Sequence, residues 1–206
     1  LSYALGDYDG YNPQWGGLPA FRQHIRDLKN ADQVALLYYD AVLMDASAKN
    51  AKMVPEFSVI NHQYKCAPKH DVANPTAPPG IVAKFHQYAM CVNAEKFADY
   101  TIDNVVRVVE ETGADGVRLD EFGGGGHLCF STMHKHIFSN EGWGNPVLQA
   151  VAYITRGIRE KLSRSGKEVL LLTEFPGHDM LASTLDGALC YDGISRRSFA
   201  RPAQIN

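Results

Sequence analysis

The sequence has no apolar run that approaches the roughly 20 residues of a membrane-spanning helix, and it carries no large excess of charge. Its 20 Lys and Arg residues and 23 Asp and Glu residues give a formal net charge of -3. This charge provides no basic surface for nucleic acid and no attraction to anionic lipid. We therefore expect no nucleic-acid partner and no membrane partner, and the oligomeric state stays open.

Cysteine is also scarce. The 206 residues contain four, which are far apart: Cys66, Cys91, Cys129 and Cys190. No pair has the CxxC spacing typical of structural zinc, and two disulfides or four buried thiols are both compatible with the pattern. The sequence begins at Leu1 without a Met, so we expect any signal peptide to lie outside it, which leaves secretion or periplasmic export open.

The apolar runs that are present alternate with amphipathic stretches. This pattern predicts helices over 16–32, 97–113 and from about 145, between strands over 2–11, 33–45, 114–122, 167–177 and 187–192. Such alternation is typical of a parallel α/β sheet. We predict one α/β catalytic domain over 1–206, of the (β/α)8 TIM-barrel type, with only part of the barrel present. The Pro-rich residues 46–95 are predicted to be a long loop or a small excursion.

Acidic residues stand at the ends of the predicted strands, and residues 114–122 have the most informative pattern. Arg118 and Asp120 are two positions apart, so their side chains point to the same face of a strand. A guanidinium beside a carboxylate keeps it ionised and oriented, as a nucleophile requires. Carboxyl ends of strands carry the sites of parallel α/β folds. We predict that Asp120 is catalytic and that Arg118 holds it; a structural ion pair is the alternative.

A second carboxylate, Glu174, follows the apolar run LLLT. Burial at the mouth of an apolar strand favours the protonated form that a general acid must offer. Two carboxylates on neighbouring strands, one ionised and one acidic, are the arrangement of glycoside hydrolysis, and their separation decides between retention and inversion. We therefore predict Asp120 and Glu174 as the catalytic pair. The alternative for Glu174 is a helix cap or a ligand of a loop amide.

Aromatic and acidic residues alternate in GDYDGYNPQWGG, residues 6–17. Flat rings stack on sugar faces, and carboxylates accept hydrogen bonds from sugar hydroxyls. We therefore expect a carbohydrate substrate, bound by residues of this stretch and of the strand ends: Asp7, Asp9, Trp15, Tyr39, Arg118, Glu121, His127 and His134. Half-buried aromatic residues at a barrel rim are the alternative.

Histidine and cysteine residues gather after Asp120, at His127, Cys129, His134 and His136. Their spacing matches no compact zinc signature, and loop histidines more often bind substrate or backbone. We therefore predict no metal and no cofactor. The glycines at 123–126 lack the Lys-Ser/Thr of a phosphate-binding loop, and we expect them to admit a ligand or to let the loop move.

Two short motifs resemble a known family. GADGVRLDEF (113–122) resembles the fourth-strand motif of the α-amylase superfamily, in which an Arg stands two residues before the nucleophilic Asp. VLLLTEFPG (169–177) resembles the strand that carries the acid/base Glu, and residues 6–40 resemble a helix-to-strand region of amylase-like and α-galactosidase-like barrels. The resemblance implies a TIM-barrel glycosidase of carbohydrate metabolism that cleaves an α-linked sugar, with Asp120 as nucleophile and Glu174 as acid/base.

The sequence departs from the amylase pattern in two ways. The family's third acid belongs to an HD motif on a later strand, and the HD at 178–179 follows Glu174 too closely to be that motif. Five strands are visible where a closed barrel needs eight. The alternatives are a metal-assisted hydrolase on the same barrel and a non-catalytic carbohydrate-binding barrel.

Overall fold

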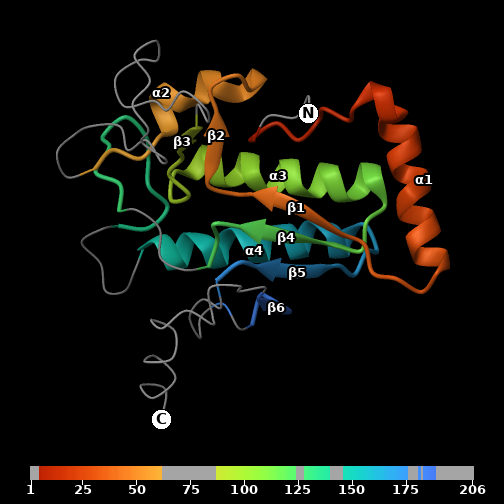
Figure 1. Cartoon of the computed structure of the whole chain (residues 1–206). Coiled ribbons are helices and arrows are strands. Elements are labelled where there is room, and N and C mark those ends of the chain that lie inside the picture. Colours follow the sequence, from red (N-terminus) through yellow and green to blue (C-terminus); the bar gives the residue numbers. More distant parts are fainter. Residues whose placement is uncertain are drawn as a thin grey trace, which may run out of the picture.

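A four-stranded sheet forms the centre of the structure, a computed structural model that describes residues 5–61, 87–123, 128–139, 146–175, 181 and 183–188. The sheet order is β1-β4-β5-β6, and all neighbours are parallel. The strands are β1 (Leu36–Asp40), β4 (Gly116–Asp120), β5 (Leu170–Thr173) and β6 (Gly187–Ala188). The arrows of β1, β4 and β5 in Figure 1 point the same way, so their carboxyl ends meet at one end of the sheet.

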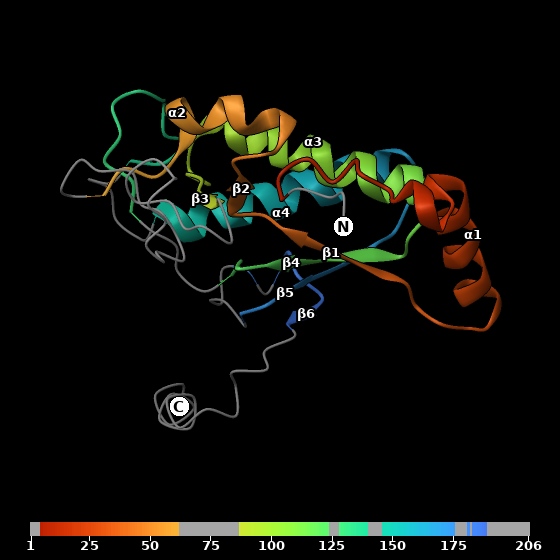
Figure 2. The same ribbon diagram turned by 45° about the horizontal axis from the view of Figure 1, so that its top comes forward.

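Two long amphipathic helices cover one face of this sheet, as Figure 2 shows. They are α3 (Glu95–Thr112) and α4 (Pro146–Arg164). Their apolar stripes pack with Leu119 and Leu171 of the sheet in one buried cluster. Each large aliphatic side chain buried in this way contributes about 1.5–3 kcal/mol. A third helix, α1 (Gly17–Asn30), follows the short η1 (Pro13–Trp15) and also contacts α3.

The other face of the sheet is open among the described residues. Tyr38 on β1 is 46% exposed, and Leu170 on β5 is 39% exposed. Parallel sheets ordinarily have both faces covered. The exposed face is the one on which Arg118 lies, because Tyr38 and Arg118 are register partners. The helices therefore cover one face, and the other face presents the polar residues of β4.

A smaller antiparallel sheet lies at the carboxyl end of the main sheet (Figure 1). It pairs β2 (Leu43–Asp45) with β3 (Gln87–Ala89), and the short η2 (Lys49–Met53) and α2 (Val54–Phe57) accompany it. These elements share a second hydrophobic cluster with the loop at 128–139 through Cys129. The predicted loop or excursion at 46–95 thus has secondary structure and a small core where it is described, and residues 62–86 lie outside the described residues.

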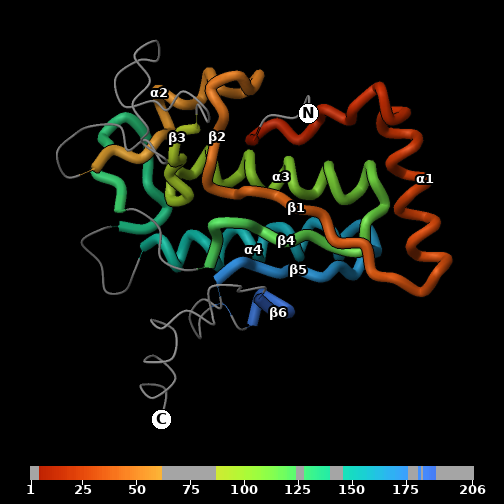
Figure 3. The backbone as a smooth tube through the Cα atoms, viewed as in Figure 1, coloured from red at the N-terminus to blue at the C-terminus, as the bar shows by residue number. Residues whose placement is uncertain are grey.

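The structure confirms the predicted helices and corrects two strands. Gly113 ends α3 in the left-handed conformation, as its place in the sequence predicted. The strand predicted over 2–11 is wrong, because residues 5–7 form a turn and positive φ angles at Gly6 and Tyr8 break the extended backbone. The strand predicted over 33–45 is two strands in different sheets. The Asp40 carboxylate accepts the Val42 and Leu43 N–H groups, and Figure 3 shows the chain turning there into β2.

The fold is therefore mixed α/β with a parallel sheet, as predicted. The described residues form an open sheet and not a closed barrel. Of the predicted last strand only β6 is described, and 189–192 lie outside the described residues. Within the described ranges, no helix combines the length and apolar character needed to cross a membrane.

Replacing Ile158 with Ala is expected to lower the free energy of unfolding by about 2–5 kcal/mol. Ile158 is fully buried on α4 within the main core, so shortening its side chain leaves a cavity in that core. Urea denaturation of the two proteins measures the difference. Val34, which is 60% exposed, provides the control, because Val34→Ala removes no buried contact. Equal losses for the two variants would contradict this account of the core.

Candidate active site

The carboxyl end of β4 holds an arginine and an aspartate in contact. Arg118 Nη1 donates a hydrogen bond to Asp120 Oδ1, and the two side chains form an ion pair that is mostly shielded from solvent. The Tyr38 hydroxyl donates to the other oxygen, Asp120 Oδ2, at 2.6 Å. The Tyr38 ring also lies beside the guanidinium, whose carbon is 5.9 Å from the ring centroid. Both oxygens of Asp120 are therefore oriented by donors.

These contacts determine the ionisation of Asp120. Partial desolvation opposes its charge, but the hydrogen bonds from Tyr38 and Arg118 and the charge of Arg118 outweigh it. The net effect holds the pKa of Asp120 below the ordinary range of an aspartate. The carboxylate is thus ionised at neutral pH and held in one orientation, as the Arg-x-Asp pattern predicted.

Glu174 lies at the end of β5, directly beside Asp120. The β4–β5 register pairs Leu119 with Thr173, and the Glu174 N–H donates to the Leu119 carbonyl at 3.1 Å. Glu174 is buried, with 5% of the residue exposed. Its Oε1 is 3.9 Å from Arg118 Nη2. The sheet therefore places the two predicted catalytic carboxyl groups together, with Arg118 beside both.

A backbone amide completes the surroundings of Glu174. The Glu121 N–H donates to Glu174 Oε2 at 3.0 Å. Glu121 has a φ of 57°, so the chain reverses directly after Asp120 and turns this amide toward β5. Gly123 follows with a φ of 95°, and a Cβ there would lie 2.6 Å from the Phe175 carbonyl oxygen. This glycine is required by the close approach of the β4 loop to β5; Gly124–Gly126 lie outside the described residues.

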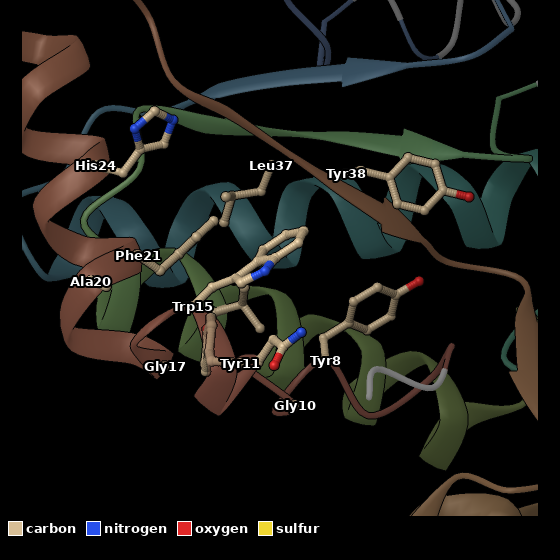
Figure 4. Close-up of a pocket in the computed structure, with 12 residues that line it drawn as sticks. Tyr8, Gly10, Tyr11, Trp15, Gly17, Ala20, Phe21, His24, Leu37 and Tyr38 are labelled. Atoms are coloured by element: carbon tan, nitrogen blue, oxygen red, sulfur yellow. The ribbon is translucent and has the colours of Figure 1, made fainter. Parts of the chain in front are cut away.

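An apolar cavity of about 410 Å³ adjoins Tyr38, between β1, α1 and the segment before α1 (Figure 4). Aromatic residues dominate its lining, which includes Tyr8, Tyr11, Trp15, Phe21 and Tyr38. Trp15 is 76% exposed. Figure 4 shows the hydroxyl groups of Tyr8 and Tyr38 pointing in the same direction, away from His24. The cavity therefore leads from an exposed indole to the tyrosine that binds Asp120.

The structure gives Asp7 and Asp9 protein partners. The Asp7 carboxylate is buried and accepts the Lys49 N–H at 2.5 Å and the Asn50 N–H at 3.1 Å, so it holds the start of η2. Asp9 forms an ion pair with the Lys49 side chain. Only Trp15 of the three residues predicted from this stretch lines the cavity. Sugar binding by Asp7, Asp9 and Trp15 stays a prediction.

The tyrosine that contacts the carboxylates is Tyr38, while the predicted residue was its neighbour Tyr39. Tyr39 is 3% exposed on the helix face, stacks on Tyr8 at 4.0 Å between ring centroids, and accepts a hydrogen bond from Asn104. Adjacent residues of a strand point to opposite faces. Tyr38 could have been predicted only from its register with Arg118, and that register is known only once the β1–β4 pairing is known.

Of the two histidines predicted to bind the sugar, the structure describes only His134. His127 lies outside the described residues. His134 is described and lies in a group with Cys91, Cys129 and His136, and its ring nitrogens contact Cys129, His136 and the Glu56 carbonyl. His134 thus belongs to a second cluster of reactive side chains, apart from the hydrogen bonds of the carboxylate pair.

Replacing Tyr38 with Phe is expected to weaken the orientation of Asp120 and to raise its pKa, because a donor to the ionised form is lost. A hydrogen bond to a charged group contributes about 1.5–3 kcal/mol. Titration of the Asp120 carboxyl group by NMR measures the shift. Tyr39→Phe is the matched control, since that hydroxyl faces the helix layer. A shift in Tyr39→Phe and none in Tyr38→Phe would contradict the observed strand faces.

Comparisons with known proteins agree with this architecture. A family model described as "Domain of unknown function (DUF6259)" matches residues 2–200, and no curated protein matches the sequence. An α-galactosidase from Thermus thermophilus, solved in complex with stachyose, superposes with a TM-score of 0.56 at 15% identity, covering 91% of this chain and 34% of that chain. A maltogenic α-amylase from Thermotoga neapolitana gives 0.55 at 14% identity, with coverages of 89% and 34%.

A cycloisomaltooligosaccharide glucanotransferase from Paenibacillus sp. gives a TM-score of 0.57 at 9% identity, covering 83% of this chain and 23% of that chain. Identities this low show similarity of fold alone. The chain therefore has a glycoside hydrolase-like α/β fold, and it spans about a third or less of the length of these proteins.

Proposed function

The chain belongs to the DUF6259 family, whose description names no activity, and from its site we propose that it is the catalytic part of a glycoside hydrolase that cleaves an α-linked sugar. The observation that carries this proposal is the pair of carboxyl groups, Asp120 and Glu174, which lie at the carboxyl ends of adjacent parallel strands beside Arg118. The structural neighbours, an α-galactosidase and an α-amylase, support the substrate class.

In the proposed reaction, the Glu174 carboxyl group donates its proton to the glycosidic oxygen as the bond to the anomeric carbon breaks. The Asp120 carboxylate attacks the anomeric carbon and forms a covalent glycosyl ester. Water then attacks the same carbon while Glu174 takes a proton from it, and the Asp120 carboxylate leaves. Arg118 and Tyr38 hold Asp120 ionised and aligned for the first step.

We propose the retaining form of this reaction, in which both carboxyl groups act from beside the same guanidinium, that of Arg118. Retaining enzymes hold the two carboxyl groups about 5–5.5 Å apart, and inverting enzymes about 6.5–9.5 Å apart to admit a water. The proposed role of Asp120 as a nucleophile requires the shorter separation.

We further propose that the sheet is part of a (β/α) barrel whose open face points inward. Tyr38, Arg118 and Asp120 lie on the face without helices, which in a closed barrel is the interior. The strands β1 and β6 are the edges of the described sheet. Further strands would close these edges. In this arrangement the exposed Trp15 and the neighbouring cavity offer aromatic surface to the sugar.

The experiment that tests the proposal is hydrolysis of aryl α-glycosides by the full chain, with the matched aryl β-glycosides as controls. We expect turnover of at least one α-glycoside and release of the α-anomer first, as measured by NMR of the fresh product. Binding of sugars without turnover would favour the non-catalytic alternative. Release of the β-anomer would contradict the role of Asp120 as a nucleophile.

A further inference from the structure

Four metal-binding side chains converge beside the small sheet. They are Cys91, which follows β3, and three residues of the loop between β4 and α4: Cys129, His134 and His136. One ligand atom from each lies within 4.8 Å of all the others. Both cysteines are reduced and buried, and both histidines are partly buried. Two sulfur and two imidazole ligands are the donor set of tetrahedral structural zinc.

The distances within the cluster match a tetrahedral ion. With Zn–N of about 2.0–2.1 Å and Zn–S of about 2.3 Å, the edges of a tetrahedron are about 3.3 Å for two nitrogens and about 3.6 Å for nitrogen and sulfur. His134 Nε2 is 3.1 Å from His136 Nε2 and 3.5 Å from Cys129 Sγ. The atoms that face one another are thus separated by about the distance that a shared ion requires.

The protonation of His134 also suits a metal ligand. Its Nδ1 lies 2.6 Å from the Glu56 carbonyl oxygen. A carbonyl can only accept, so Nδ1 carries the hydrogen, and the neutral ring then has its lone pair on Nε2. This is the nitrogen that points at Cys129 and His136. A backbone carbonyl that orients the ring in this way is the usual outer partner of a zinc-binding histidine.

The position of the cluster indicates a structural ion. Cys129 packs in the second hydrophobic cluster, and the Ile60 N–H donates to its sulfur at 3.4 Å. A backbone bridge joins His136 to Ala94, at the start of α3. Four protein ligands leave no open position for substrate or water, and two thiolates neutralise the charge of a divalent ion.

From this geometry we propose that Cys91, Cys129, His134 and His136 bind one zinc ion, which fastens the loop after Asp120 to the small sheet. Sequence spacing alone does not indicate the site, because Cys91 is far from the other three ligands along the chain. The proposal does not depend on the proposed glycosidase activity, since none of the four ligands belongs to the carboxylate pair.

The first test is the zinc content of the tag-free full chain, purified under reducing conditions and measured by inductively coupled plasma mass spectrometry. We expect about one zinc per chain. Cys129→Ser and His134→Ala are expected to lose stoichiometric zinc. His24→Ala is the matched control, because His24 is exposed on α1 and lies outside the cluster. Zinc retained in both cluster variants, or absent from the reduced wild-type chain, would overturn the proposal.

A second measurement keeps the test decisive if the cysteine variants do not fold. Wild-type chain stripped of metal is titrated with Co²⁺, which reports tetrahedral thiolate coordination through intense visible bands and sulfur-to-metal charge transfer. We expect saturation at one equivalent and displacement of Co²⁺ by Zn²⁺. Reduced chain that takes up no Co²⁺, together with a Cys91–Cys129 disulfide in the unreduced chain, would show that the two cysteines pair with each other instead.

Discussion

Replacing Asp120 with Asn is expected to lower kcat/KM for an aryl α-glycoside by about 10⁴-fold or more, because the covalent intermediate cannot form without the carboxylate. Sugar affinity should change little, since the residue keeps its size and its place beside Tyr38 and Arg118. Steady-state kinetics measures the first effect, and calorimetry with a substrate sugar measures the second.

Asp103→Asn provides the control for this loss. Asp103 is an exposed aspartate on α3 that pairs with Lys161 on the helix side of the sheet. Its replacement should leave kcat/KM within about two-fold of wild type, as expected for a surface substitution. Comparable activity in Asp120→Asn and wild type would remove Asp120 from the mechanism.

Replacing Arg118 with Met is expected to have the second largest effect, a loss of about 100-fold in kcat/KM near neutral pH. Removing one partner of a largely buried pair costs about 3–5 kcal/mol, and part of that loss falls on the alignment of Asp120. Arg118 also lowers the pKa of Asp120, so the acid limb of the pH–rate profile should move to higher pH in the variant. Rates measured across the acid range test both effects.

The lowered pKa of Asp120 also determines how the stability of the fold changes with pH. The pKa of Asp120 is lower in the folded chain than in the unfolded chain, where it is about 3.9. This ionisation stabilises the fold fully above that value, and the stabilisation is lost as the pH falls through the folded pKa. Wild type should therefore lose more stability than Arg118→Met as the pH falls below about 5, because the variant lacks most of this stabilisation from the start. The exposed Arg164, changed to Met as a control, should behave like wild type.

Local patterns predicted the pieces of the site that lie on one strand. Arg118 and Asp120 share a face because of the two-residue period, and this needs no knowledge of the neighbouring strands. Helix boundaries such as Gly113 were similarly local. The choice between Tyr38 and Tyr39 depended on which face of β1 meets the helices. A one-residue difference exchanges the two faces, and only the β1–β4 register decides it.

Other features could not be predicted because they depend on contacts between distant segments. The Asp7 carboxylate looks like a free strand-end acid in the sequence, but it binds the backbone of η2, 42 residues away. The break between β1 and β2 follows from the turn that Asp40 makes with Val42 and Leu43. The Cys and His cluster joins segments on either side of α3 and β4, so no spacing rule detects it.

The most direct test of the proposed function is to trap the covalent intermediate. The full chain is incubated with an activated 2-deoxy-2-fluoro α-glycoside or a related slow substrate of the sugar that it hydrolyses, and the labelled peptide is identified by mass spectrometry. The proposed mechanism predicts one sugar attached to Asp120, and no label in Asp120→Asn. A label on another carboxylate, or turnover of the substrate without any label at Asp120, would contradict it.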